Sequence, residues 1–122
     1  MIKLTFCIHR LSHLTREQFQ AHWLNDHGAI VQRNAAALNV RRYVQHHTLD
    51  HPINAAIQQG RGTPEAFDGI AELWFDSVES MQAPAGTPEG KAAMRELNED
   101  ESRLIDMERS VVFVGQEHEL VS

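Results

Sequence analysis

The sequence has one cysteine, Cys7, and no apolar run long enough to cross a membrane. A single cysteine excludes an internal disulfide, which is compatible with a reducing compartment. A membrane-spanning helix needs about 20 apolar residues. Here the apolar residues at the start of the chain alternate with polar ones and stop before Arg10. The start also lacks the basic segment and longer apolar core of a signal peptide. We therefore expect a cytoplasmic protein with no membrane partner.

Basic residues are few, and the formal net charge is −6 with histidine neutral. A nucleic-acid-binding surface needs a basic face, so we expect no nucleic-acid partner. The P-loop, the GxSxG elbow, the HExxH zinc motif and the calcium-binding loop are all missing. His22 and Asp26 have helical i, i+4 spacing, but a metal would need a third ligand. We expect no metal and no cofactor.

The chain does contain enough apolar sequence for one core. It has 122 residues, 42% of them hydrophobic, which is too short for two domains with separate cores. It has no linker, no low-complexity tract and no internal repeat. Residues 1–122 are therefore predicted to form a single domain.

Four segments have the composition of β-strands, and the first alternates clearly between apolar and polar residues. The predicted strands cover residues 2–9, 40–47, 67–76 and 110–115, and Ile2, Leu4, Phe6 and Ile8 share one face of the first. Residues 49–66 form a long irregular connection with at most a short helix at 53–59. A short helix is also expected at 77–83.

Two longer helices are predicted between these strands. The first follows a capping box at Thr15 and Gln18, and its apolar stripe is formed by Phe19, Trp23, His27 and Val31. Gly28 is expected to kink or break this helix before a second piece at 29–38. The other helix opens at Thr87-Pro88-Glu89 and runs to about Ile105, with residues 96–101 as a solvated acidic face.

The resulting order, βαββαβ, predicts an α+β fold of the ferredoxin-like kind. Its antiparallel sheet carries the helices on one face and leaves the other face bare. Two such bare faces can close on each other, so we expect a homodimer, a dimeric α/β barrel. Assembly beyond the dimer stays open.

His27 and Tyr43 are the candidate catalytic residues. His27 lies on the apolar stripe of the first helix, where burial would keep the imidazole neutral and able to accept a proton. Tyr43, the only tyrosine, lies in the second strand, where its hydroxyl could donate to a developing oxyanion. The alternatives are a core histidine bonded to a backbone carbonyl at the Gly28 break, and a tyrosine that only packs. For Glu72 and Asp76 we favour ion pairs with Arg41 or Arg42 over an acid-base role beside His27.

The order and spacing of several short segments resemble the EthD domain over nearly the whole chain. These segments are residues 3–6, 14–23 with His27, 42–44, 68–75 and 87–90. The resemblance implies a dimeric α/β barrel with a pocket between the helices and the sheet of each subunit. The wider superfamily includes muconolactone isomerases, cofactor-free monooxygenases and haem-degrading enzymes.

The methylmuconolactone isomerase type is the branch with the most similar site. It has a histidine at the place of His27 and a tyrosine at the place of Tyr43, and both match. It also uses a cysteine where this chain has Leu73, and a leucine cannot replace a thiol. The resemblance therefore implies histidine acid-base chemistry, without that branch's own isomerisation.

These observations give a first hypothesis and two alternatives. The first is a cofactor-independent proton-transfer enzyme, an isomerase, decarboxylase or dehydratase, that acts on a small apolar, cyclic or aromatic compound in a catabolic pathway. His27 would move a proton, Tyr43 would orient the substrate, and the pocket walls would be Phe6, Trp23, Leu73 and Phe75. The alternatives are a non-catalytic ligand-binding accessory protein, and a haem-binding protein or cofactor-free monooxygenase.

Overall fold

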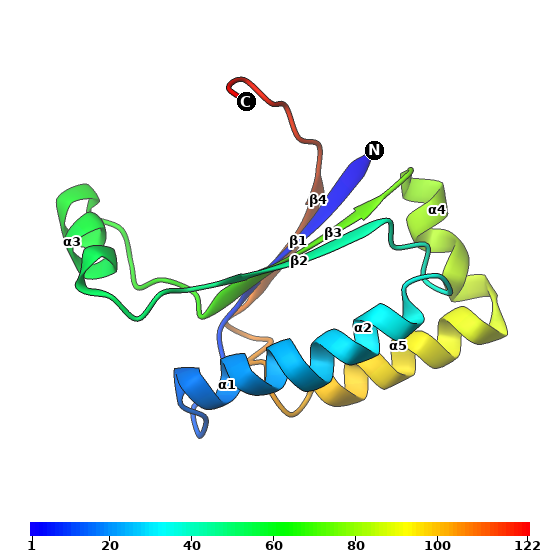
Figure 1. Ribbon diagram of the computed structural model, residues 1–122, viewed down its shortest axis with the longest axis horizontal. Coiled ribbons are helices and arrows are strands. Elements are labelled where there is room, and N and C mark those ends of the chain that lie inside the picture. The colour runs from blue at the N-terminus through cyan, green and yellow to red at the C-terminus, as the bar shows by residue number, and fades with distance from the viewer.

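The computed structural model describes all of residues 1–122, and its strands form one antiparallel sheet. The strands are β1 (Ile2–Ile8), β2 (Arg42–His47), β3 (Gly69–Phe75) and β4 (Val111–Gly115), in the order β2-β3-β1-β4. The predicted ferredoxin-like fold is confirmed, with the main helices on one face of the sheet (Figure 1). No helix here is both long and apolar enough to span a bilayer.

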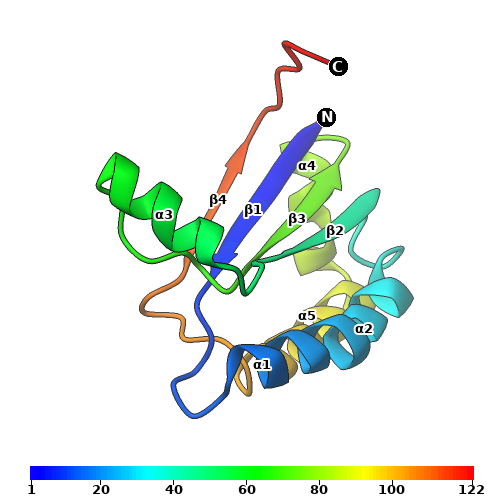
Figure 2. The same ribbon diagram turned by 60° about the vertical axis from the view of Figure 1, so that its left-hand side comes forward.

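The helix layer consists of two antiparallel rods that cross beneath the sheet. One rod is continuous through α1 (Arg16–His22), a π-helical turn η1 (Trp23–His27) and α2 (Gly28–Asn34). The other is α5 (Pro88–Glu101), preceded by the short α4 (Val78–Gln82) and the 3-10 turn η2 (Ala83–Gly86). Figure 2 shows α1, α2 and α5 side by side under the sheet. The core between the layers is built from Ile8, Phe19, Trp23, Ala71, Leu104 and Ile105.

The alternation of β1 separates two faces, as predicted. Leu4, Phe6 and Ile8 turn toward the helices and line a cavity there. Lys3 turns to the opposite face, where its amine lies 2.7 Å from Glu72 of β3. The predicted pairing of Glu72 and Asp76 with an arginine is confirmed for Asp76, which lies 2.8 Å from Arg41. It is wrong for Glu72, whose partner is Lys3 of the neighbouring strand.

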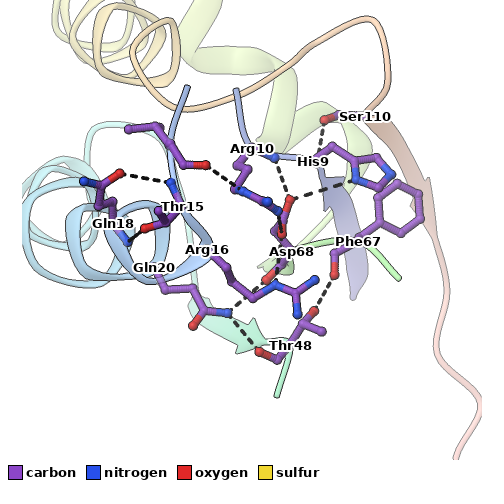
Figure 3. A network of polar contacts seen from close by, with 11 residues as sticks. His9, Arg10, Thr15, Arg16, Gln18, Gln20, Thr48, Phe67, Asp68 and Ser110 are labelled. Atoms are coloured by element: carbon purple, nitrogen blue, oxygen red, sulfur yellow. Dashed lines mark hydrogen bonds and ion pairs between the residues drawn. The ribbon is translucent and has the colours of Figure 1, made fainter. Parts of the chain in front are cut away.

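The capping box at the start of α1 is present, and a buried aspartate fixes what comes before it. The Gln18 amide donates to the Thr15 hydroxyl (3.1 Å), and the Gln18 side chain accepts from the Thr15 amide (3.0 Å). Asp68, 2% exposed, accepts from the Arg10 backbone (2.8 Å), the Arg10 guanidinium (2.5 Å) and the Arg16 guanidinium (3.0 Å) (Figure 3). This network sets the position of α1 against the start of β3.

The segment predicted as mostly irregular contains a full helix, α3 (Pro52–Arg61). His51 caps it by accepting from the Ile53 amide at 3.0 Å, and Gly62 ends it in the left-handed conformation with φ 68°. In both views α3 projects from one end of the sheet, away from α1, α2 and α5 (Figures 1 and 2). Residues 49–66 do not line the cavity beneath the sheet.

The second long helix is shorter than predicted. It ends at Glu101 instead of about Ile105. The residues that follow turn back toward β1, where Ile105 makes an isolated bridge with Arg10. Leu104 and Ile105 are buried in the core, with exposed fractions of 2% and 4%. The apolar residues that extended the helical pattern are therefore core residues of a loop.

Candidate active site

A cavity of about 370 Å³ lies between the sheet and the two helical rods. Twelve of its fourteen lining residues are hydrophobic, and the other two are His27 and Glu101. Tyr43 of β2 is one of the lining residues. Pockets for small organic ligands start at about 300 Å³ and combine apolar walls with a few polar groups. The cavity fits that description.

His27 is placed in the cavity wall by an irregular turn of the first rod. The Gly28 amide donates to the carbonyl of Trp23, five residues back, and this wide spacing defines η1. Such π-helical turns occur often at functional sites. The sequence predicted an irregularity at Gly28, but the turn comes before the glycine and the rod does not break. His27 is 6% exposed.

The His27 ring is held by a buried aspartate of α5. His27 Nδ1 lies 2.8 Å from Asp100 Oδ2, and His22 Nε2 lies 2.8 Å from Asp100 Oδ1. Burial opposes ionisation of Asp100, but hydrogen bonds from the two histidines outweigh it and hold its pKa below the ordinary value. A carboxylate only accepts hydrogen bonds, so Nδ1 of His27 carries the ring proton.

The remaining ring nitrogen is therefore a base. Burial lowers the pKa of His27 below the ordinary 6.5, against the opposing effects of the Asp100 hydrogen bond and charge. The imidazole is neutral at pH 7, and Nε2 has a free lone pair. No buried side-chain nitrogen or oxygen lacks a partner, so Nε2, which makes no hydrogen bond, is open to the cavity. The alternative of a core histidine bonded to a backbone carbonyl is wrong.

Asp100 was not predicted from the sequence, because residues 96–101 were expected to be a solvated acidic face. That expectation is wrong for Asp100, which is 3% exposed. The signal was nevertheless there, because Ala93, Leu97, Asp100 and Leu104 have the spacing of one helical face. An aspartate on an otherwise apolar stripe indicates a buried partner, which here is the histidine pair.

A chain of hydrogen bonds between uncharged side chains orients Tyr43. Gln45 Nε2 donates to Tyr43 Oη (2.7 Å) and to the Trp23 carbonyl (2.8 Å), while Gln45 Oε1 accepts from His47 Nε2 (2.8 Å). Since the Tyr43 oxygen accepts from Gln45, its own proton is free to be donated elsewhere. Burial raises the pKa of Tyr43 to about 12, so the hydroxyl stays protonated.

Comparison with known proteins identifies the fold and the family. The family model for the EthD domain matches residues 11–108, most of the chain. The chain belongs to the EthD family. A search of curated proteins gives no match.

Solved structures of two EthD proteins and of another dimeric protein have the same fold. A family member from Bacillus halodurans is 19% identical, with a TM-score of 0.65 over 97% of this chain and 99% of that one. An EthD-like protein from Ralstonia eutropha is 18% identical, with a TM-score of 0.60 over 94% and 89%. A dimeric protein of ferredoxin-like fold from Bacteroides fragilis is 11% identical, with a TM-score of 0.60 over 95% of each chain. At these identities the likeness establishes the fold.

Most of the predicted wall residues of this EthD domain do line the cavity. Phe6, Trp23 and Leu73 are among its lining residues, but Phe75 is not. Phe75 is buried, 5% exposed, at the far end of β3 opposite Ile2. The prediction of Phe75 as a wall residue is therefore wrong, because its position two residues beyond Leu73 carries it past the end of the cavity. Leu97, Ile105 and Met107 complete the wall instead.

Two other groups of the EthD domain lie apart from the cavity. Cys7 pairs with Ile70 and Val111 on the opposite face of the sheet, so its thiol does not replace the cysteine missing at Leu73. His22 Nδ1 lies 3.3 Å from the Asp26 carboxylate, at the outer end of the Asp100 network. No group of three His, Cys, Asp or Glu side chains is arranged to hold a metal ion.

Proposed function

We propose that this EthD domain is a cofactor-independent proton-transfer enzyme of the isomerase, decarboxylase or dehydratase type. Its substrate would be a small cyclic or aromatic compound bearing a carbonyl, lactone or phenol, in the degradation of such compounds. One observation carries the proposal. A neutral histidine whose Nδ1 is bonded to a buried aspartate presents Nε2 to an apolar cavity of about 370 Å³.

The chemistry follows from the roles that these groups can fill. His27 Nε2 takes a proton from carbon or from a hydroxyl of the bound substrate, and Asp100 stabilises the imidazolium that forms. Tyr43 donates its hydroxyl proton to the oxygen on which negative charge develops. A single positioned base supplies about 10²–10⁴-fold acceleration. The apolar walls favour an uncharged, compact substrate.

The assembly we propose is a homodimer formed through the uncovered face of the sheet. Val111 and Phe113 of β4 lie on that face with exposed fractions of 49% and 53%. An exposed apolar strand of this kind marks an association surface. Light scattering is expected to give a dimer for the wild type and a monomer for Phe113→Asp. A monomeric wild type would contradict the barrel.

The catalytic proposal is tested by a thermal-shift screen followed by turnover assays. Small lactones, phenols, quinones and aromatic ketones are screened against the wild type, His27→Ala and His13→Ala. A ligand that binds only the folded state raises the melting temperature. His13 is the matched control, since it is exposed in the turn before α1.

Two outcomes separate enzyme from carrier. We expect at least one stabilising compound to be converted by the wild type and by His13→Ala, and its turnover to fall about 10²–10⁴-fold in His27→Ala. Compounds that stabilise all three proteins equally without conversion would contradict catalysis and identify the domain as a ligand-binding accessory protein.

A further inference from the structure

The Glu101 carboxyl is an acidic group in the wall of the cavity that the proposed function leaves without a role. It lies at the last residue of α5 and shares the cavity with His27 and Tyr43. No hydrogen bond or ion pair engages its side chain, whereas the neighbouring Asp100 is fully partnered. Glu101 is half-buried, and since no buried side-chain oxygen lacks a partner, its carboxyl oxygens are open to the cavity, where they can exchange a proton or bind a ligand.

Glu101 and Asp100 have different surroundings because adjacent side chains on an α-helix diverge by about 100°. Asp100 turns toward the histidines of the first rod, and Glu101 turns into the cavity. Strands β1, β3 and β4 present only apolar side chains there, namely Leu4, Phe6, Ile8, Ala71, Leu73 and Val112. The titratable groups around Glu101 are therefore His27 from η1, Tyr43 from β2 and Asp100 on its own helix.

These surroundings favour the neutral acid. Burial, with a smaller effect of the Asp100 charge, raises the pKa of Glu101 to about 7. A carboxyl that titrates near neutral pH can give a proton and regain it within each turnover. The cavity thus holds a base, His27, and an acid, Glu101, whose environments shift both pKa values toward these roles.

We propose that Glu101 is a second catalytic residue, the group that returns a proton to the substrate at a different atom from the one His27 deprotonates. The inference rests on the proposed function and narrows it to a proton shift between two positions. The fitting substrates are small β,γ-unsaturated carbonyl compounds, which carry an acidic α-carbon and a basic γ-carbon in conjugation.

The proposed step balances without any further reactant. His27 Nε2 removes a proton from the α-carbon, and the electron pair of that C–H bond forms a dienolate whose oxygen accepts from Tyr43. The γ-carbon then takes the proton of the Glu101 carboxyl, and the double bond moves into conjugation with the carbonyl. The imidazolium and carboxylate that result are neutralised when the proton passes from His27 to Glu101 through water.

The experiment uses cyclohex-3-enone as the probe, in deuterated water, with the full-length protein. Two rates are measured on the same compound: exchange of the α-hydrogens, which needs only a base, and conversion to cyclohex-2-enone, which also needs an acid. The variants are His27→Phe, Glu101→Gln and the matched control Glu99→Gln, which changes an exposed residue of the same helix.

The proposal expects a separation of the two rates. Glu101→Gln keeps the α-exchange within a fewfold of the wild type and loses conversion by about 10²-fold, whereas His27→Phe loses both and Glu99→Gln loses neither. If Glu101→Gln converts the probe as fast as the wild type, the role of Glu101 is overturned and the proposed function stands. If the wild type neither exchanges nor converts the probe, both are overturned.

An infrared measurement tests the acid without turnover. Wild type minus Glu101→Gln difference spectra are expected to show the carbonyl band of a neutral carboxylic acid at pH 6, lost with a midpoint near the pKa of about 7. Because this measurement does not depend on turnover, it tests whether Glu101 is protonated even if Glu101→Gln changes the shape of the cavity. Absence of the band at pH 6 would contradict the inference.

Discussion

Asp68 and Asp100 are both almost fully buried, with exposed fractions of 2% and 3%, yet their partners differ in kind. Asp68 is bonded to two arginines, which stay charged at every relevant pH. Asp100 is bonded to two histidines, one of which presents its other nitrogen to a cavity. Asp68 therefore fixes the fold at one end of the helix layer, and Asp100 orients the His27 ring in the cavity wall at the other.

The largest effect is expected from Asp100→Asn. The amide can donate to Nδ1 of His27, which favours the tautomer that carries its proton on Nε2 and removes the base from the cavity. We expect the α-exchange of cyclohex-3-enone to fall about 10²–10⁴-fold, with a loss of only about 1–2 kcal/mol in the free energy of unfolding. Unchanged exchange in a folded variant would mean that Asp100 is structural, as Asp68 is.

Asp68→Ala is expected to show the reverse pattern. The change leaves the Arg10 and Arg16 guanidinium groups and the Arg10 amide without their acceptor. Since both arginines also reach solvent, we expect a loss of about 3 kcal/mol on urea unfolding and little change in the exchange rate of the folded fraction. Asp76→Ala, which breaks an exposed aspartate–arginine pair, is the control and should barely change stability.

The pH dependence of stability should separate the two networks further. His27 has a folded pKa below 6.5, so between those two values the unfolded chain binds more protons at this position. The wild type should therefore gain stability relative to His27→Phe as the pH rises toward 6.5, and the difference should then level off. A difference that shrinks over this range would mean that the Asp100 pair raises the His27 pKa instead.

The contribution of Asp68 to the free energy of unfolding changes at lower pH. The pKa of Asp68 is lowered because hydrogen bonds from Arg10 and Arg16 outweigh the opposing effect of burial. Its contribution is complete above the ordinary value of 3.8 and is lost as the pH falls through the folded pKa. The Asp68→Ala deficit should hence be constant from pH 5 to 8 and vanish in acid.

The smallest effect is expected from Gln45→Leu. This change removes the hydrogen bonds that the Gln45 side chain makes to Tyr43, His47 and the Trp23 carbonyl. Tyr43 loses the donor that fixes its hydroxyl, so the exchange rate should fall roughly tenfold, equivalent to about 1.4 kcal/mol. The loss should disappear in a Tyr43→Phe background, since the two residues act through one contact. An equal loss in both backgrounds would show that Gln45 acts through the Trp23 carbonyl alone.

The fold could be predicted well because its signals are local. The capping box at Thr15, the alternation of β1 and the Thr87-Pro88 helix start each depend on neighbouring residues, and the structure confirms them. Where the prediction failed, apolar residues belonged to a loop, as Leu104 and Ile105 do. A helical period cannot distinguish a buried loop from another helical turn.

The site could be predicted only in part, because its chemistry depends on contacts between distant residues. His27 was identified from its place on an apolar stripe. Its partner Asp100 lies 73 residues away, in a run of acids that looks solvated. The π-helical turn that places the ring is also invisible in the sequence, since Trp23 and His27 have ordinary helical spacing. Glu101 was missed because its burial depends on β-strand residues that close the cavity.

The central claim is that His27 is a neutral base with its proton on Nδ1, held there by Asp100. The most direct test is a long-range ¹H–¹⁵N correlation spectrum of the histidine rings over a pH titration, with the His27 signals assigned from His27→Phe. The account predicts an unprotonated Nε2 and a protonated Nδ1 at pH 7, with a titration midpoint below 6.5. A ring protonated on Nε2, or an imidazolium at pH 7, would contradict it.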